Sequence, residues 1–290
     1  MSNFTDFIGG GSASAVNEKK EFNSSENLIT LADGRVYLKG GVTSTDTSTY
    51  PDATSQVAYS GTSFSTATQD VSPKKIIWDG SYLWLLGGQN RNVYKYNAAG
   101  VYQNVSWSTG SQDTSASGIT WDGTHFWVTG DANNAVFKYN ASGVYQNVSW
   151  STAALEHNPS DITWDGTHFW VVGYLGDQVH KFNASGVYQN VSWSVAAQDI
   201  IPEGLTWDGT HFWVVGQQND TAYKYNAAGV YTGESFSIAA QDSAPDGIAW
   251  DGTSLLVCGS SNDTVFKYQD QIGIVNQAST QGRQNYTRIK

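Results

Sequence analysis

The chain has 290 residues, of which only 14% are charged, and its formal net charge is −11 at pH 7. An acidic surface repels phosphate backbones, so neither DNA nor RNA is an expected partner. The single cysteine, Cys258, excludes an intrachain disulfide and a cysteine-based metal site. Abundant Gly, Ser, Thr, Trp and Tyr, without a 3.6-residue apolar period, predict an all-β protein.

Residues 1–55 are predicted to form an N-terminal arm. Their start, MSNFTDFIGGGSASA, has neither the basic nor the apolar region of a secretory signal. The segment LITLADGRVYLKGG (28–41) predicts a short hairpin that turns at Asp33 and Gly34, followed by a Thr/Ser-rich linker. No apolar run approaches the ~18 residues of a membrane span. We therefore expect synthesis in a cytoplasm and no membrane insertion.

The tripeptide WDG recurs at 78, 121, 164, 207 and 250, always 43 residues apart. Within one copy, residues 161–203, four short strands follow one another: DITW, HFWVVG, DQVHKFN and VYQNVSWSV. A fixed period of this length with four strands per copy is typical of the blades of a β-propeller.

The two ends of the repeat region complete each other. The last copy stops after its third strand near Tyr268, whereas YSGTSFSTATQD (59–70) aligns with the fourth strand and loop YTGESFSIAAQD (231–242). Pairing these ends would remove two exposed sheet edges. Residues 56–268 are thus predicted to form a five-bladed β-propeller closed by its N- and C-terminal segments. Residues 269–290 are a C-terminal arm, and both arms are expected to leave on the face of the WDG turns.

The repeated WDGTHFW resembles a reactive cluster but is interpreted as scaffold. Its aspartate occurs in every copy, where an Asp-Gly turn uses the carboxylate to satisfy local backbone donors. Its histidine occurs in three copies, and ligands separated by a blade each do not converge on one metal. The 12 tryptophans could be sugar-stacking platforms, but packing between sheets is the favoured interpretation. No metal and no cofactor are predicted.

The face opposite the WDG turns is the predicted binding face. Its fourth-to-first-strand loops carry one acid each in a common register, and these acids could surround the channel mouth and recruit a cation. A solvated acidic rim or simple loop caps are the alternatives. The loops between second and third strands differ most between copies, as binding loops on a rigid frame do. The candidate ligand-binding residues are Asp70, Asp113, Glu156, Asp199, Asp242, Arg91, Asn133, Tyr174, Gln217, Asn219 and Asn262.

The repeat, roughly "DG…LWV…N…V…Y" over residues 57–268, resembles propellers of the broad NHL, YVTN and SMP-30-like kind. The arms, with FIGGGSAS at the start and NYTRIK at the end, resemble those of tailed-bacteriophage virion proteins. This resemblance implies a protein exposed on the virion that is not an enzyme. It would be a structural protein of a tail or capsid assembly, present as a homo-oligomer or in many copies.

The resemblance also implies its contacts. Residues 1–55 and 269–290 would bind other virion proteins, and the propeller would serve adhesion to a host glycan or protein, or another protein contact. The alternatives are a five-bladed carbohydrate-binding lectin and, more remotely, a glycoside hydrolase that uses channel carboxylates.

Overall fold

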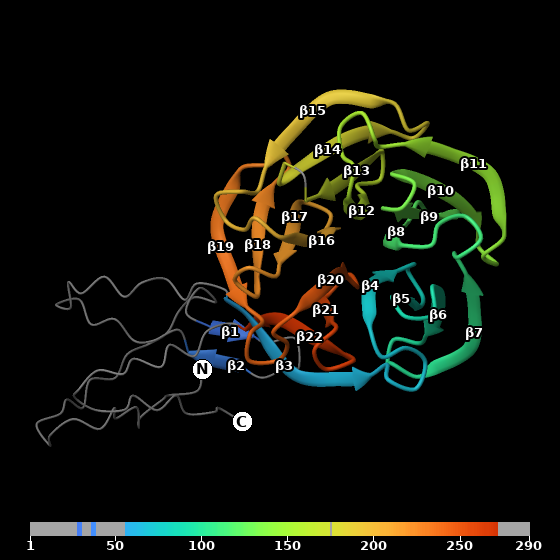
Figure 1. Ribbon diagram of the computed structural model, residues 1–290. Coiled ribbons are helices and arrows are strands. Elements are labelled where there is room, and N and C mark those ends of the chain that lie inside the picture. Colours follow the sequence, from blue (N-terminus) through green and yellow to red (C-terminus); the bar gives the residue numbers. More distant parts are fainter. Residues whose placement is uncertain (1–27, 31–35, 39–55, 175, 272–290) are drawn as a thin grey trace, which may run out of the picture. The chain divides into compact units, whose positions relative to one another are not determined.

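The computed structural model (Figure 1) describes residues 28–30, 36–38, 56–174 and 176–271. Two units are separate: residues 56–271 form one, and the segments before and after them belong to the other. In the smaller unit, β1 (Leu28–Thr30) pairs antiparallel with β2 (Val36–Leu38). The predicted turn at Asp33 and Gly34 lies outside the described residues. The arms otherwise lie outside the described residues.

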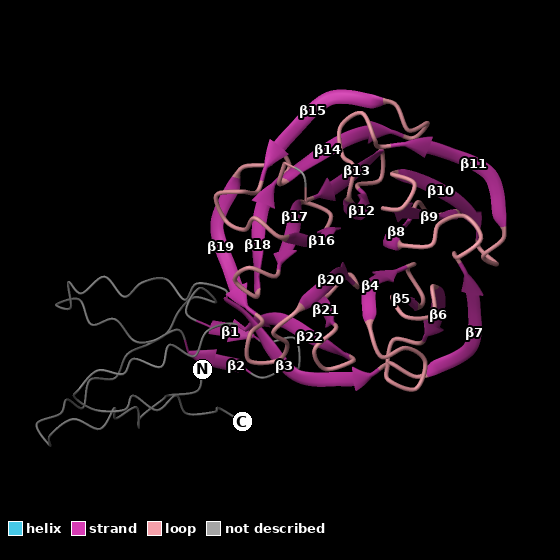
Figure 2. Cartoon of the chain, viewed as in Figure 1, coloured by secondary structure: helices cyan, strands magenta, loops and turns pink. Residues whose placement is uncertain are grey.

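Residues 56–271 fold into five four-stranded antiparallel blades, which confirms the predicted five-bladed β-propeller. None of the described residues lies in a helix (Figure 2), and accordingly none belongs to a helix that could span a membrane. The strands of blade 1 are β4 (Pro73–Trp78), β5 (Leu83–Gly87), β6 (Asn92–Tyr96) and β7 (Tyr102–Ser108). Those of blade 2 are β8 (Ala116–Trp121), β9 (His125–Gly130), β10 (Ala135–Asn140) and β11 (Tyr145–Ser151).

The remaining blades follow the same order. Blade 3 contains β12 (Pro159–Trp164), β13 (His168–Gly173), β14 (Gln178–Asn183) and β15 (Tyr188–Ser194). Blade 4 contains β16 (Pro202–Trp207), β17 (His211–Gly216), β18 (Thr221–Asn226) and β19 (Tyr231–Ser237). Blade 5 contains β20 (Pro245–Trp250), β21 (Leu255–Gly259), β22 (Thr264–Gln271) and β3 (Gln56–Ser65).

The ring is closed by blade 5, whose fourth strand comes from the other end of the chain. Strand β3 pairs antiparallel with β22 from Thr264↔Ser65 to Gln271↔Gln56, a few residues beyond the predicted end at 268. The first strands β4, β8, β12, β16 and β20 surround the axis and contact one another, and the fourth strands form the perimeter (Figure 1). Both segments that lead to the arms therefore leave from the same pair of strand ends.

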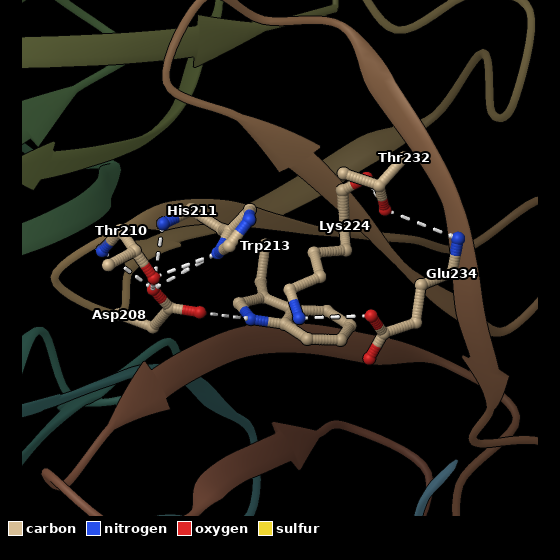
Figure 3. A network of polar contacts seen from close by, with 7 residues as sticks. All are labelled: Asp208, Thr210, His211, Trp213, Lys224, Thr232 and Glu234. Atoms are coloured by element: carbon tan, nitrogen blue, oxygen red, sulfur yellow. Dashed lines mark hydrogen bonds and ion pairs between the residues drawn. The ribbon is translucent and has the colours of Figure 1, made fainter. Parts of the chain in front are cut away.

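Each WDG turn is held by its aspartate, as Figure 3 shows for blade 4. One oxygen of Asp208 accepts hydrogen bonds from the backbone N–H groups of Thr210 and His211, at 2.8 and 2.7 Å. The other oxygen accepts a hydrogen bond from the indole Nε1 of Trp213 at 3.0 Å, and Lys224 lies over that indole ring. Burial alone would raise the pKa of Asp208, but these donors outweigh it and hold the pKa below its usual value. The motif is thus a folded turn.

Blade 5 keeps the turn although Leu256 replaces the tryptophan. There, Lys267 Nζ donates to Asp251 Oδ2 at 2.9 Å, in the place that an indole N–H fills in the other blades. In those blades the matching lysine instead lies over the indole, with Nζ 5.0 to 5.2 Å from the ring centroid. One lysine position therefore serves two different partners, according to whether a tryptophan is present.

The repeated aromatic side chains fill the interfaces between blades. Trp84, Trp127, Trp170 and Trp213 are at most 4% exposed, so they cannot serve as sugar-stacking platforms. The fourth-strand tryptophans Trp107, Trp150 and Trp193 have buried indole N–H groups without a hydrogen-bond partner among the described residues. Blades 4 and 5 have Phe236 and Phe64 in that position. Of these two sets, the second-strand tryptophans donate a hydrogen bond through the indole nitrogen and the fourth-strand tryptophans do not.

This difference predicts unequal costs for the same substitution. Trp127→Phe should destabilise the protein by about 2 kcal/mol more than Trp150→Phe, because it leaves Asp122 Oδ2 without its indole donor. Trp150→Phe should cost less than about 1.5 kcal/mol, since no hydrogen bond is lost. Urea unfolding of both variants measures the difference. Equal costs would contradict a structural role for the aspartate–indole bond.

Candidate functional site

The five acids predicted to line the channel mouth are loop caps, one of the alternatives that the sequence left open. Asp70, Asp113, Glu156, Asp199 and Asp242 are only 1–2% exposed. One oxygen of each accepts a hydrogen bond from the backbone N–H two residues later, at 2.7 to 2.9 Å. Asp70, Asp113 and Asp199 also accept one from the N–H of Asn90, Asn133 and Asn219, respectively. All five carboxylates thus cap their own loops, and Asp70, Asp113 and Asp199 also tie two loops together.

Neighbouring residues leave these caps little freedom. A Cβ on Gly130, at the end of β9, would lie 2.1 Å from Cγ of Asp113, so only glycine fits there. In four blades the residue before the cap is glutamine, and its Oε1 accepts a hydrogen bond from a tyrosine hydroxyl at 3.2 to 3.3 Å. In blade 3 this pair is replaced on both sides by Leu155 and Phe182, which belong to one apolar cluster. The packing around these acids therefore serves the structure of the loops. Ligand binding at the acids stays a prediction.

The candidate residues of the second-to-third-strand loops divide into two groups. Asn133, Asn219 and Asn262 are exposed, and each side-chain amide donates to the backbone oxygen of Gln112, Gln198 or Gln241. Arg91 is exposed and has a left-handed φ of 56°. Tyr174 and Gln217, in contrast, occupy the first loop position and reach the next blade's inner strand.

Those two side chains contact a group of charged residues that the sequence analysis did not select. The Tyr174 hydroxyl donates to Glu203 on β16, and Gln217 Nε2 donates to Asp246 Oδ1 on β20 at 3.0 Å. Lys75 on β4 donates to the backbone oxygen of Asp246 at 2.7 Å, and its Nζ lies 3.6 Å from Glu203 Oε2. Four inner-strand residues, Lys75, Asp161, Glu203 and Asp246, form what we call the axial charge group.

Three glycines make room for this group. In the register of Lys75 and Asp161, the other inner strands have Gly118, Gly204 and Gly247. A Cβ on Gly118 would lie 2.7 Å from Cα of Asp161, and one on Gly247 equally close to Cα of Lys75. The two charged side chains thus occupy space near the axis that their neighbours leave empty. Their burial follows: Lys75 is 2% exposed and Asp161 is 3% exposed.

Burial raises the pKa of all three acids of the axial charge group. It raises the pKa of Asp161 to about 7, although Lys75 and hydrogen bonds from the N–H groups of Leu205 and Ile162 oppose the shift. It also raises the pKa of Glu203 and of Asp246, again against the attraction of Lys75. Burial would lower the pKa of Lys75, but the three carboxyls outweigh it and raise that pKa. The raised pKa of Lys75 favours its charged form, and the raised pKa values of the three acids favour their protonated forms.

The group has the features of a functional site. Buried ionisable groups with shifted pKa values cluster at binding and catalytic sites, although structural ion pairs show them too. Asp246 is only partly buried and Tyr174 is 38% exposed, so a ligand could reach both from the loop face. A carboxyl with a pKa near 7 can accept or release a proton at neutral pH. Among the residues that the structure describes, no three His, Cys, Asp or Glu side chains are grouped as a metal site.

A sequence signal for the group exists, but it is weak. The residues four positions before the tryptophan of each WDG are Lys74, Ser117, Ser160, Glu203 and Asp246. The residues three positions before it are Lys75, Gly118, Asp161, Gly204 and Gly247. These first-strand positions differ in charge between copies whose turns are identical. The divergence between copies therefore extends from the loops to the inner strands, where it marks this charged group.

Comparison with known proteins supports the fold. No family model matches the chain, and no curated protein matches its sequence. Among solved structures, glutaminyl cyclase from Myxococcus xanthus superposes with a TM-score of 0.58 at 10% identity, covering 74% of this chain and 96% of that one. A virginiamycin B lyase from Staphylococcus aureus gives 0.43 at 18% identity, covering 87% and 84%. At these identities the likeness concerns the fold alone.

One prediction is corrected by this comparison. The chain was expected not to be an enzyme, but an enzyme, glutaminyl cyclase, has this propeller architecture. A propeller frame with arms therefore gives no ground for denying catalysis, because function depends on the site that a fold carries. The comparisons give no indication of a bacteriophage origin or of carbohydrate binding.

Asp161 predicts a pH dependence of stability. Its pKa is about 7 in the folded protein and about 3.9 in an unfolded chain, so between these values only the folded state keeps the proton. The free energy of unfolding should therefore fall as the pH rises, and the share due to Asp161 should be about 2 kcal/mol between pH 5 and 7.5. Asp161→Asn should flatten this slope in urea unfolding. The exposed Asp270→Asn is the control, and an unchanged slope in Asp161→Asn would refute the assignment.

The Leu155–Phe182 replacement predicts coupling between two substitutions. Leu155→Gln or Phe182→Tyr alone should each cost about 1–3 kcal/mol, because each leaves a largely buried polar group unpaired. The double variant should recover at least about 1 kcal/mol of the summed cost by forming the hydrogen bond of the other blades. A double-mutant cycle in urea measures the coupling. Strict additivity would show that the two positions do not meet.

Proposed function

We propose that the protein is a display module, held at one face of blade 5 and presenting its loop face for adhesion or protein contact. The main support is that the two ends of the propeller and the axial charge group lie on opposite faces. Both propeller ends, at the Gln56↔Gln271 pair, lie at the WDG-turn ends of the strands. The axial charge group and its contacts Tyr174 and Gln217 lie at the opposite, loop ends. A module attached at one face leaves the other accessible.

The charge of the loop face supports a basic target. Three carboxyls of the axial charge group face one buried lysine, and the raised pKa values of these carboxyls reflect negative charge that burial leaves poorly compensated. A cationic side chain of a partner would favour their ionised forms. The whole chain is acidic as well, with a net charge of −11, so long-range attraction acts in the same direction.

We further propose that the protein is part of a tailed-bacteriophage particle, in a tail or capsid assembly. Its support is the resemblance of the two arms, residues 1–55 and 269–290, to anchoring regions of virion proteins. The arms would contact other virion proteins, and several copies would be present per particle. The propeller would then meet a host-surface glycan or protein.

Truncation tests the anchoring. Because the ring closes between Gln56 and Gln271, deleting residues 1–50 or 273–290 should leave a folded propeller that is no longer incorporated into particles. Circular dichroism verifies folding, and mass spectrometry of purified particles measures incorporation. Normal amounts of either truncated chain in the particles would contradict attachment through that arm.

Substitution tests the display face separately. The full-length double variant Glu203→Gln/Asp246→Asn should join particles normally but adsorb to target cells at least about tenfold more weakly, a loss of about 1.4 kcal/mol. Glu234→Gln, on the perimeter strand β19, is the matched control and should adsorb like the wild type. Unchanged adsorption of a folded double variant would exclude the axial charge group from target binding.

A further inference from the structure

One position in the second-to-third-strand loops lies against the fourth-to-first-strand loop that carries the cap acid of the same blade. The residues there have a left-handed φ of 46 to 56°, and they are Arg91, Asn134, Asp177, Asp220 and Asp263. The backbone oxygen of each accepts a hydrogen bond at 2.7 to 2.9 Å from the first residue of the turn that ends in the cap acid. In blade 4 this donor is Ile238, and the turn ends at Asp242. The residue at this position therefore lies beside a cap loop.

Blade 2 shows what a side chain at this position contacts. In the orientation that satisfies its hydrogen bonds, the side-chain nitrogen of Asn134 donates to the backbone oxygen of His157, the residue after the cap acid. It also donates to the backbone oxygen of Asp131 at 3.2 Å. By register, the equivalent oxygens in blade 4 belong to Ser243 and Gln217. The position thus faces acceptors, and an amide can satisfy them because it carries N–H groups.

Blades 3, 4 and 5 place an aspartate where blade 2 has this amide. Oδ1 of Asp177, of Asp220 and of Asp263 is shielded from solvent and has no hydrogen-bond partner among the described residues. An ionised carboxylate is acceptor-only, so it cannot satisfy the neighbouring backbone oxygens as the amide does. A buried oxygen without a donor is unfavourable, and it calls for a bound ion or another compensating group.

Blade 4 differs from the other two because its cap acid also keeps an oxygen without a partner. Asp242 is 1% exposed, and its Oδ1 accepts a hydrogen bond from the N–H of Ala244 at 2.8 Å. Its Oδ2 is buried and has no partner within the part of the chain that the structure describes. In blade 3, by contrast, Asp199 beside Asp177 uses both oxygens, for the N–H groups of Ile201 and Asn219.

The two acids of blade 4 act on each other. Burial raises the pKa of Asp220, and the negative charge of Asp242 is the next largest cause, followed by that of Asp199. Repulsion of this kind is relieved when a cation lies between the carboxylates. Two carboxylates with one unpartnered oxygen each therefore lie in neighbouring loops, beside backbone oxygens that blade 2 satisfies with an amide.

We propose that the loop end of blade 4 binds a calcium ion between Asp220 and Asp242. Oδ1 of Asp220 and Oδ2 of Asp242 would supply two charged ligands, and the backbone oxygens of Gln217 and Ser243, with water, the neutral ones. Calcium takes about six to eight oxygen ligands in a flexible geometry, whereas magnesium requires a near-ideal octahedron and keeps its waters. Two carboxylates suffice for such a site, so it needs no group of three acidic side chains.

The ion would join two loops on the face that carries the axial charge group. Gln217 follows the second strand of blade 4, and its side chain donates to Asp246 of that group at 3.0 Å. The calcium site does not rest on the proposed display function, because binding of the ion is measured on the isolated protein.

The test uses calcium chloride and the full-length protein after treatment with EDTA. Isothermal titration calorimetry should show saturable binding, and calcium should raise the melting temperature above that in sodium chloride of equal ionic strength. Asp220→Asn should weaken calcium binding at least about tenfold, because a charged ligand is lost. In EDTA this variant should melt no lower than the wild type, since its amide can donate as Asn134 does. Asp177→Asn is the matched control and should bind calcium like the wild type.

A second variant keeps the test decisive if Asp220→Asn does not fold. Asp242→Asn retains an oxygen for the N–H of Ala244 and should also weaken calcium binding at least about tenfold. Absence of calcium binding to the wild type, or an equal stabilisation by sodium chloride, would overturn the proposal. Equal affinity of the wild type and folded Asp220→Asn, an equal loss in Asp177→Asn, or equally tight binding of magnesium would overturn it as well.

Discussion

The pairing of β22 with β3 is the constraint on which the remaining structure depends. It joins segments about 200 residues apart and supplies blade 5 with its fourth strand. Each blade buries its aromatic side chains against its neighbours, so an unclosed ring would leave the faces of blades 5 and 1 without their contacts. The same pairing brings the two ends of the propeller together, and the proposed attachment at one face rests on it.

Repetition and its exceptions have different roles in this molecule. The repeated features, such as the Asp–indole bond and the capped loops, satisfy buried polar groups in the same way in successive blades. Where the repeat changes without loss of packing, two residues change together, as Leu155 with Phe182. Where the first strands depart from the repeat, charged side chains lie near the axis instead of serine and glycine.

The fold and the site contribute separately to function. A propeller supplies a rigid frame and two loop faces, and the same architecture is found in glutaminyl cyclase, so the frame alone does not distinguish binding from catalysis. The axial charge group departs from the internal repeat. Lys75 and Asp161 stand where the other three copies have glycine, and Glu203 and Asp246 stand where two copies have serine. Burial raises the pKa of its carboxyls, so a charged partner that binds there would change their protonation.

The sequence by itself determined the number of blades, the four strands in each and the closure, because the 43-residue period and the complementary ends are local, repeated signals. It also identified WDGTHFW as a turn and the tryptophans as core. Only the tertiary structure decided between the alternatives for the five acids and showed them as loop caps, since three of them also accept hydrogen bonds from a second loop. It alone assembled the axial charge group, whose members lie on four strands far apart in the chain. No single motif contains such a site, because its charges meet only where the first strands converge on one axis.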